Sequence, residues 1–254
     1  MSLEPSPSLK QVLDRCASTN DLLKEAGHAG APHGSWISSR VQDAGRGRMG
    51  RKWESEPGNL FLSLIVRDLE SSLWTWIPLT AAVAIGEFLT RKLKIPARIK
   101  WPNDLVLADS VGGYSKLGGI LCEGLGGANG AFVVVGVGLN CLQGPEGLEI
   151  PTTSLTAILK QPIGADQVRD EIRTAILEAM ADLARSGYEE MRTRYEALAL
   201  YQPGTWIEWS EGGVLHSAQV LGLGAFGELR VLESAQNKPR ALYAEDIRAR
   251  PVRA

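Results

Sequence analysis

The stretch 116-KLGGILCEGLGGANGAFVVVGVGLN-140 contains two apolar runs on either side of a segment rich in glycine. Short runs of Val, Ile and Leu bounded by Gly and Asn are typical of buried strands. The runs Asn59–Arg67 and Arg98–Trp101 have the same character. Because few helical patterns separate the strands between 98 and 140, we expect a mixed or antiparallel sheet rather than repeated βαβ units.

Helical patterns flank this group of strands. The spacing of apolar residues predicts a long buried helix over Leu73–Leu93 and another over Asp166–Arg185, followed by a shorter one. A further helix is expected to begin at Ser18 or Thr19, with a side-chain N-cap there and Asp21 in its first turn. The sequence therefore predicts an α/β (α+β) fold in which helices back a mixed sheet.

The character of the chain changes after Pro203-Gly204. Short apolar runs joined by glycine pairs follow, as in a small β-barrel of about 50 residues. We therefore place a domain boundary near 200–204, with a large domain over 9–202 and a small barrel over 203–254. Residues 1–8, rich in Ser and Pro, are expected to be disordered.

Composition excludes several classes of protein. The chain has 254 residues, 44% of them apolar, with 27 Lys and Arg against 29 Asp and Glu, for a formal charge of −2. There is no overall basic field to hold a nucleic acid or an anionic membrane. The longest apolar stretches, 77–85 and 131–142, are shorter than the roughly 20 residues of a membrane span.

The beginning of the chain and its cysteines indicate a cytoplasmic protein. The first 20 residues include Glu4, Pro5 and Asp14, where a signal peptide needs an apolar run. The sequence has three cysteines, an odd number, and no C-x-x-C motif. This pattern argues against a disulfide framework and against a zinc site rich in Cys, and it fits a reducing compartment.

The segment 42-QDAGRGRMGRKW-53 is the most informative for chemistry. Between Ala44 and Trp53, three glycines alternate with four cations and there is no acid. Glycine lets a backbone approach an anion closely, and guanidinium groups reach its oxygens, so this loop predicts a phosphate site. A solvent-facing basic loop or an RNA contact remains an alternative. The glycine spacing matches neither the Walker motif nor the dinucleotide fingerprint.

Three further segments carry polar residues at the ends of predicted strands. The motif 100-KWPND-104 combines a cation for phosphate with Asp104, which can hold Mg²⁺ through water, although such a motif is often only a turn. Lys116 precedes two glycines that let a ligand lie against the backbone, and its alternative is a surface lysine. The strand 133-VVVGVGLN-140 ends in Asn140 and could be core alone.

Together with Ser18-Thr19-Asn20, these four segments resemble biotin protein ligases in order and rough spacing, over about residues 10–250. The resemblance implies a catalytic domain related to lipoyl ligases, with an SH3-like C-terminal domain. It also implies a two-step reaction, in which biotin and Mg·ATP form biotinyl-5′-AMP and a lysine of a biotin carboxyl carrier domain then accepts the biotin. Since only residues 1–8 precede the catalytic domain, we expect the monofunctional type, without the family's DNA-binding winged helix.

The resemblance also implies roles for individual residues. The residues expected at the biotin are Ser18, Thr19, Asn20, Gln42, Arg46, Gly47, Arg48, Lys116 and Gly118. Those expected at ATP or the adenylate are Arg48, Arg51, Trp53, Lys100, Asn103 and Asn140. Lys116, Arg48 and Lys100 are expected to be catalytic, and Asp104 to bind Mg²⁺. Asn20 has an alternative as a helix-entry residue, because Ser, Thr and Asn all cap helices.

The remaining expectations concern mobility and partners. We expect Gly45–Gly50 and Gly112–Gly119 to be mobile without ligand, and the inserted stretch 108–115 to be a long loop. The protein is expected to be a monomer or a homodimer that binds neither DNA nor a membrane. The alternatives are a lipoate or octanoate ligase or transferase of the same superfamily and, from another class, a nucleic-acid-binding module that uses the basic loop 46–52.

Overall fold

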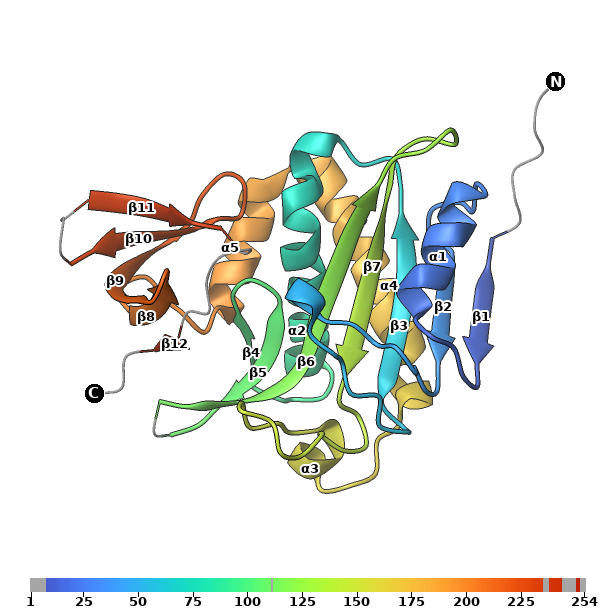
Figure 1. Ribbon diagram of the computed structural model, residues 1–254, viewed down its shortest axis with the longest axis horizontal. Helices are drawn as coiled ribbons and strands as arrows, with labels where there is room; N and C mark the ends of the chain where they lie inside the picture. The colour runs from blue at the N-terminus through green and yellow to red at the C-terminus, as the bar shows by residue number, and fades with distance from the viewer. Residues whose placement is uncertain (1–7, 111, 235–237, 244–249, 252–254) are drawn as a thin grey trace.

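The computed structural model describes residues 8–110, 112–234, 238–243 and 250–251 (Figure 1). Of the N-terminal segment 1–8 that we expected to be disordered, 1–7 lie outside the described residues. The elements of the first half are β1 (Lys10–Leu13), α1 (Thr19–His28), β2 (Trp36–Ser39), η1 (Arg48–Gly50), β3 (Leu60–Val66), η2 (Ser71–Trp76), α2 (Ile77–Arg91), β4 (Ala97–Lys100), β5 (Asp104–Ala108) and β6 (Tyr114–Leu125). Those of the second half are β7 (Phe132–Leu139), α3 (Leu155–Leu159), α4 (Ala165–Ser186), α5 (Tyr188–Leu198), β8 (Trp206–Glu211), β9 (Val214–Leu223), β10 (Leu229–Glu233), β11 (Lys238–Leu242) and β12 (Arg250–Pro251).

The large sheet has the strand order β1-β2-β3-β7-β6-β5-β4. Its edge strand β1 runs parallel to β2, and the other neighbouring strands pair antiparallel. The predicted mixed sheet is confirmed. The antiparallel order follows from the short connections between β4, β5, β6 and β7, which leave no room for a crossover helix.

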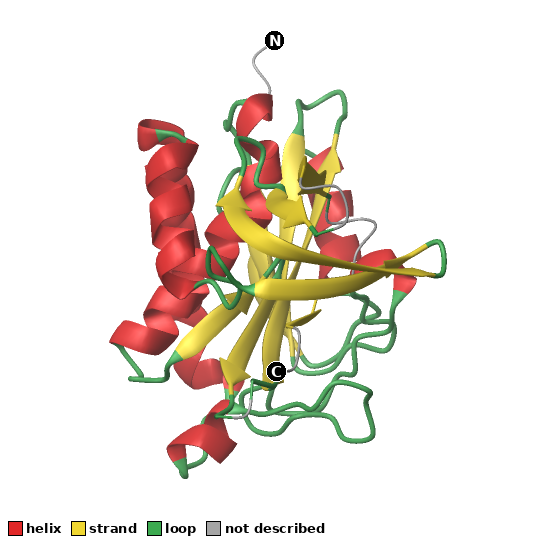
Figure 2. Ribbon diagram, turned by 90° about the vertical axis from the view of Figure 1, so that its left-hand side faces the viewer, coloured by secondary structure: helices red, strands yellow, loops and turns green. Residues whose placement is uncertain are grey.

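Both faces of the central strands are buried, but under different helices. Leu64 and Val135 belong to the main core, which includes buried residues of α2 and α4. Their neighbours Ile65 and Val134 point to the opposite face, where they pack with Leu23 of α1. Each such side chain contributes roughly 1.5–3 kcal/mol by burial. Figure 2 shows helices along one side of the strands. On the opposite face of the sheet, α1 packs on β2, β3 and β7. The neighbouring part of that sheet face is therefore left for other contacts.

The helix α2 is a core helix. With η2 it forms a segment, Ser71–Arg91, that is long and apolar enough to cross a membrane, but 67% of its most apolar window is buried inside the protein. It packs against α4, α5 and the sheet. Its apolar character is therefore explained by its place between these layers.

The C-terminal β-structure begins at Trp206 and forms a separate antiparallel sheet of order β11-β10-β9-β8-β12 within the described residues. Two indoles attach it to the large unit. Trp76 Nε1 donates to the carbonyl of Ala225 at 2.7 Å, and Trp101 Nε1 donates to that of Gly227 at 3.0 Å. Because buried indole N–H groups need acceptors, these contacts fix the turn before β10 against the large unit.

Several short elements were not predicted, among them β1, α3 and β5. Strand β1 is mostly exposed, so no apolar pattern marks it, and α3 is only five residues long. Strand β5 lies directly after a turn motif. The stretch 108–115 was expected to be a long loop, and its residue 111 lies outside the described residues. On either side of it the chain instead pairs closely: Ala108 pairs with Tyr114, and Asp109 N–H donates to the carbonyl of Gly113. The expected mobile segment Gly112–Gly119 likewise lies mostly in β6.

Candidate active site

The N-terminus of α1 is capped from outside the helix. Ser18 is the N-cap residue, at the predicted helix start, and it is buried, but its side chain makes no capping hydrogen bond, so only the predicted side-chain contact is wrong. Gln42, which follows β2, takes this role: Thr19 N–H donates to Gln42 Oε1 at 2.8 Å. Asp21 does not close a capping box either, because its carboxylate binds Arg46. The capping residue thus comes from a segment that no local pattern connects to α1.

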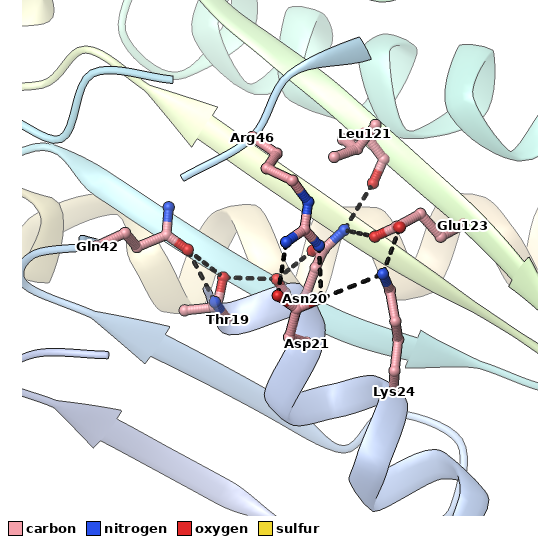
Figure 3. Close-up of polar contacts among 9 residues, drawn as sticks. Thr19, Asn20, Asp21, Lys24, Gln42, Arg46, Leu121 and Glu123 are labelled. Carbon is pink, nitrogen blue, oxygen red and sulfur yellow. Dashed lines mark hydrogen bonds and ion pairs between the residues drawn. The ribbon is translucent and has the colours of Figure 1, made fainter. Parts of the chain in front are cut away.

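The Asn20 side chain makes hydrogen bonds to β6 and β3 and does not cap the helix. Its Nδ2 donates to Glu123 Oε2 at 2.7 Å and lies 3.4 Å from the Leu121 carbonyl, while Ser63 Oγ donates to its Oδ1 at 2.6 Å (Figure 3). A Cβ added at Gly136 would overlap that Oδ1 atom. Only glycine at this position of β7 lets the Asn20 amide approach the sheet, so Gly136 is required by a close contact.

The basic loop, residues 44–53, is joined to α1 by an ion pair. Arg46 binds both carboxylate oxygens of Asp21, one of them at 2.6 Å, and Lys24 lies 3.2 Å from the same carboxylate. The hydrogen bonds from Arg46 lower the pKa of the Asp21 carboxyl to about 2, from an ordinary value of 3.8. Lys24 also pairs with Glu123, so the loop, α1 and β6 share one charged cluster.

The loop itself is a hairpin. Gly47 N–H donates to the Arg51 carbonyl at 2.7 Å, and Trp53 N–H donates to that of Gly45 at 2.9 Å. At the tip, Met49 has φ 57° and ψ 35°, a left-handed conformation that an L-residue adopts at a cost. The predicted site residue Gly47 therefore shapes the loop through its backbone.

The other cations of the basic loop also contact protein groups. Arg48 Nη1 donates to Asn103 Oδ1 at 3.2 Å, which connects the loop to the turn before β5. Arg51 is exposed and its Nε contacts only the Arg48 carbonyl within the loop. Lys52 pairs with Glu54 at 2.9 Å. Of the predicted adenylate residues, Arg48 and Asn103 are thus brought together, whereas the hydrogen bond of the Arg51 side chain stays within the loop.

Trp53 lies flat against glycines of the sheet. A Cβ on Gly138 would be 2.5 Å from Trp53 Cζ2, and one on Gly119 would be 3.3 Å from Cζ3. These two glycines are register partners on β6 and β7, next to Gly136 on the same face. The indole Nε1 is buried without an acceptor among the described residues. The three glycines form a floor with no side chains, and in this structure the Trp53 indole covers part of it.

Lys116 faces this floor and is half-buried. Its Nζ lies 2.7 Å from Asp104 Oδ1 and 5.3 Å from the centre of the Trp53 ring. The strand register shifts between Leu105 and Val106, so β6 has a bulge next to Lys116. Bulges redirect side chains, and this one lies at the proposed site. A solvated surface lysine is excluded by the ion pair and the indole contact.

Three more predicted residues differ in their surroundings. Lys100 is 8% exposed and lies 5.6 Å from the centre of the Tyr114 ring. Asn140 Nδ2 donates to the carbonyl of Thr153 at 3.0 Å, so its amide holds the segment after β7 in place. Gly118 lies in β6, where a Cβ would be 2.8 Å from the Gly138 carbonyl. Its role is close packing of β6 on β7.

Asp104 is the acidic residue that pairs with Lys116. Among the described residues, there is no group of three or more His, Cys, Asp or Glu side chains suited to a metal ion. A single carboxylate is nevertheless sufficient for Mg²⁺ that arrives on a nucleotide, since the phosphates and water supply most ligands. Asp104 therefore fits a nucleotide-borne Mg²⁺ and not a metal held by protein alone.

Sequence reasoning missed Ser63, Glu123 and Asn59. Ser63 is a lone polar residue inside the apolar run of β3, and Glu123 follows a buried part of β6. A polar residue within an apolar strand was the feature of the sequence that could have indicated a role for each. Asn59 Oδ1 accepts from three successive backbone N–H groups, of residues 141–143, and so fixes the chain after β7. A polar residue at a strand start gives no hint of such a distant role.

Comparison with known proteins agrees with this geometry. A model of the biotin/lipoate A/B protein ligase family matches residues 12–140, just over half of the chain. The chain belongs to this family. Family members similar to it include the biotin--[acetyl-CoA-carboxylase] ligase of Paracoccus denitrificans, 32% identical over 198 residues, which are 74% of this chain and 80% of that protein.

Two other family members extend the comparison. The biotin--[acetyl-CoA-carboxylase] ligase of Mycobacterium tuberculosis is 37% identical over 151 residues, 57% of this chain, and the match spans only 53% of that protein. The solved biotin protein ligase of Aquifex aeolicus, in complex with biotin and ATP, is 25% identical with a TM-score of 0.76. That superposition covers 96% of this chain and 97% of the other, so the likeness includes the C-terminal sheet.

Proposed function

We propose that this chain is an ATP-dependent biotin protein ligase. One observation carries the proposal: a floor of three glycines, Gly119, Gly136 and Gly138, lies between neutral polar side chains at α1 and the cations Arg48 and Lys116. These neutral side chains, here called the wall, are those of Thr19, Asn20, Gln42 and Ser63. A ligand with an apolar ring and polar edges can pack on the floor and form hydrogen bonds with the wall. A carboxylate and a phosphate can pair with the cations. Its relatives named as biotin ligases support the same assignment.

The proposed reaction has two steps. A biotin carboxylate oxygen attacks the α-phosphorus of ATP, the bond to the β-phosphate oxygen breaks, and pyrophosphate leaves. The ε-amine of a carrier lysine then attacks the carbonyl of biotinyl-5′-AMP, loses a proton, and AMP leaves. Lys116 and Arg48 would stabilise the negative charge that grows between carboxylate and phosphate, an effect usually worth several kcal/mol.

Mg²⁺ would enter with ATP. Asp104 is the residue we propose to hold it, and the ion would neutralise phosphate charge. Lys100 and Asn103 would contact the nucleotide from the same turn, and Asn140 would keep the neighbouring segment in place. An Asp104→Asn variant that needs no more Mg²⁺ than the wild type for half-maximal rate would contradict this role.

Biotin is preferred over lipoate because of the polar wall. Thr19 and Gln42 present a hydroxyl and an amide at the end of the floor. The ureido group of biotin can pair with both, whereas the dithiolane ring of lipoate has neither an N–H nor a carbonyl. Buried polar groups left without partners cost a competing ligand orders of magnitude in rate. The wall therefore selects biotin.

The proposed acceptor is the biotin carboxyl carrier domain of a carboxylase. We also propose a cytoplasmic location, which the three free cysteines fit, and a monomer or homodimer without a DNA-binding role. Incubation of the protein with ATP, biotin and a purified carrier domain should add one biotinyl group to one lysine, detected by mass spectrometry. Lipoate in place of biotin should add nothing. A lipoylated carrier would overturn the assignment.

A further inference from the structure

Resting on the proposed function, we propose that Glu123 is a positioning residue that sets the direction of the side-chain hydrogen bonds from Thr19 through Ser63 to Asn20 in the wall at α1. The residues concerned are joined in one chain of contacts, which runs from Glu123 through Asn20 and Ser63 to Thr19 (Figure 3). Ser63 is fully buried, and Thr19 and Asn20 are 3% and 5% exposed. Water is therefore excluded from most of this series of hydrogen bonds, and each of its protons has few alternative acceptors.

The first step fixes Asn20. An ionised carboxylate only accepts hydrogen bonds, so the side-chain atom of Asn20 that lies 2.7 Å from Glu123 Oε2 must be the NH₂ group. The more distant Leu121 carbonyl accepts from the same group. The amide oxygen of Asn20 then faces Ser63. A reversed amide would place two oxygens in contact at the Glu123 end.

The second step fixes the hydroxyls. Ser63 has one proton, and it donates to Asn20 Oδ1 at 2.6 Å. The 2.7 Å contact between Ser63 and Thr19 therefore needs the Thr19 proton. Thr19 Oγ1 also lies 3.0 Å from Gln42 Oε1, but donating there would leave the Thr19 and Ser63 oxygens 2.7 Å apart with no proton between them. The direction that satisfies most groups runs from Thr19 to Ser63 to Asn20 to Glu123.

The third step is the consequence for the ligand. With its proton directed to Ser63, Thr19 Oγ1 presents only a lone pair to the site, so it accepts from an N–H. Gln42 Oε1 is used at α1, so Gln42 Nε2 is the part of the amide left to donate to a carbonyl. An acceptor beside a donor is complementary to the N–H and C=O of a cyclic urea. Glu123, which is not part of the floor itself, thus determines what the wall recognises.

The second oxygen of Glu123 pairs with Lys24, which also contacts Asp21 and through it the basic loop. A Glu123 variant could therefore act through that charged cluster instead. Lys24→Met separates the two explanations, because it removes the ion pair and leaves the Asn20–Glu123 hydrogen bond in place. Glu25→Gln, on the exposed face of the same helix, is the matched control for the loss of one carboxylate.

The test is the KM for biotin and the kcat in ATP–pyrophosphate exchange. A glutamine at 123 can accept or donate, so Asn20 no longer has one orientation. We expect Glu123→Gln to raise the KM about tenfold, with kcat changed by less than about twofold. Ser63→Ala interrupts the chain and should raise the KM by a similar factor. The double variant should resemble the single ones, because both changes break the same chain.

The outcomes separate the two levels of the proposal. Lys24→Met and Glu25→Gln should keep the wild-type KM within about twofold. An unchanged KM in Glu123→Gln, KM effects that multiply in the double variant, or an equal loss in Lys24→Met would overturn the role of Glu123 while biotin-dependent exchange persists. A wild-type protein with no biotin-dependent exchange would overturn the proposed function, and this inference with it. Ser63→Ala keeps the test decisive if Glu123→Gln does not fold.

Discussion

The two sides of the glycine floor are built differently. At α1, the wall is neutral, and its members Thr19, Asn20 and Ser63 are buried and fixed by short hydrogen bonds within the protein. The basic loop 44–53, whose Trp53 covers part of the floor, is cationic and mostly half-buried or exposed, and it is held by a few ion pairs. A fixed wall suits recognition, which gains from preorganisation, whereas a charged loop suits a ligand that brings its own anions.

The largest expected effect concerns the charged side. Lys116→Ala should slow biotin-dependent pyrophosphate exchange by about 10² to 10³, because it removes a preorganised cation from the growing negative charge. Lys116→Arg should recover only part of this rate, since a planar fork does not replace a compact ammonium. Transfer from synthetic biotinyl-5′-AMP should suffer less than exchange. Near-normal exchange in Lys116→Ala would contradict the assignment.

The next effect contrasts the wall with the indole on the floor. Gly136→Ala forces a methyl group against Asn20 and should lower the free energy of unfolding by about 1–3 kcal/mol. Gly138→Ala meets the Trp53 indole, which belongs to the basic loop and can move away. Its melting temperature without ligand should fall less. If thermal unfolding shows the reverse order, the wall is not the more rigid of the two.

Much of this architecture could be predicted from the sequence because long apolar runs reveal buried strands and helices, although the short buried strand β5 directly after a turn was missed. The sheet, α1, α2 and α4 all belong to that class. Strand β1 and the cap of α1 could not be predicted, because the first is an exposed edge and the second depends on Gln42 from a distant segment.

The candidate site divides along a similar line. Residues in motifs, such as Arg48 and Lys116, were predicted because glycine and cation patterns are visible locally. Glu123 and Ser63 were not, since single polar residues in apolar strands acquire a role only when β3, β6 and α1 meet. The structure also adds a contact that the sequence did not predict for Arg46, which binds the Asp21 carboxylate.

Hydrogen exchange should distinguish the two sides directly. We expect the backbone amides of 45–53 to gain protection when biotin and ATP are added, because the bound anions hold the cations of the loop. The amides of Asn20–Lys24 in α1 should change little. Equal protection of the loop with and without ligands would show that it does not close.

The smallest expected effect is the pH dependence of the stability that the ion pair between Arg46 of the loop and Asp21 of α1 contributes. The pKa of Asp21 is lowered in the folded protein to about 2, so its contribution to stability is present above pH 3.8 and is lost as the pH falls through 2. Asp21→Asn should therefore melt below the wild type at pH 5, and the gap should narrow towards pH 2. The Asp21 side chain is 40% exposed, so the gap is small. A gap that widens on acidification would contradict the pairing.

The most direct test of the central claim is ATP–pyrophosphate exchange with a single added acid. With biotin, the purified protein should exchange label between pyrophosphate and ATP, and with lipoate or octanoate at the same concentration it should not. Biotin alone offers the ureido group that the wall at Thr19 and Gln42 is arranged to bind. Exchange that is as fast with lipoate as with biotin, or absent with biotin, would contradict the account.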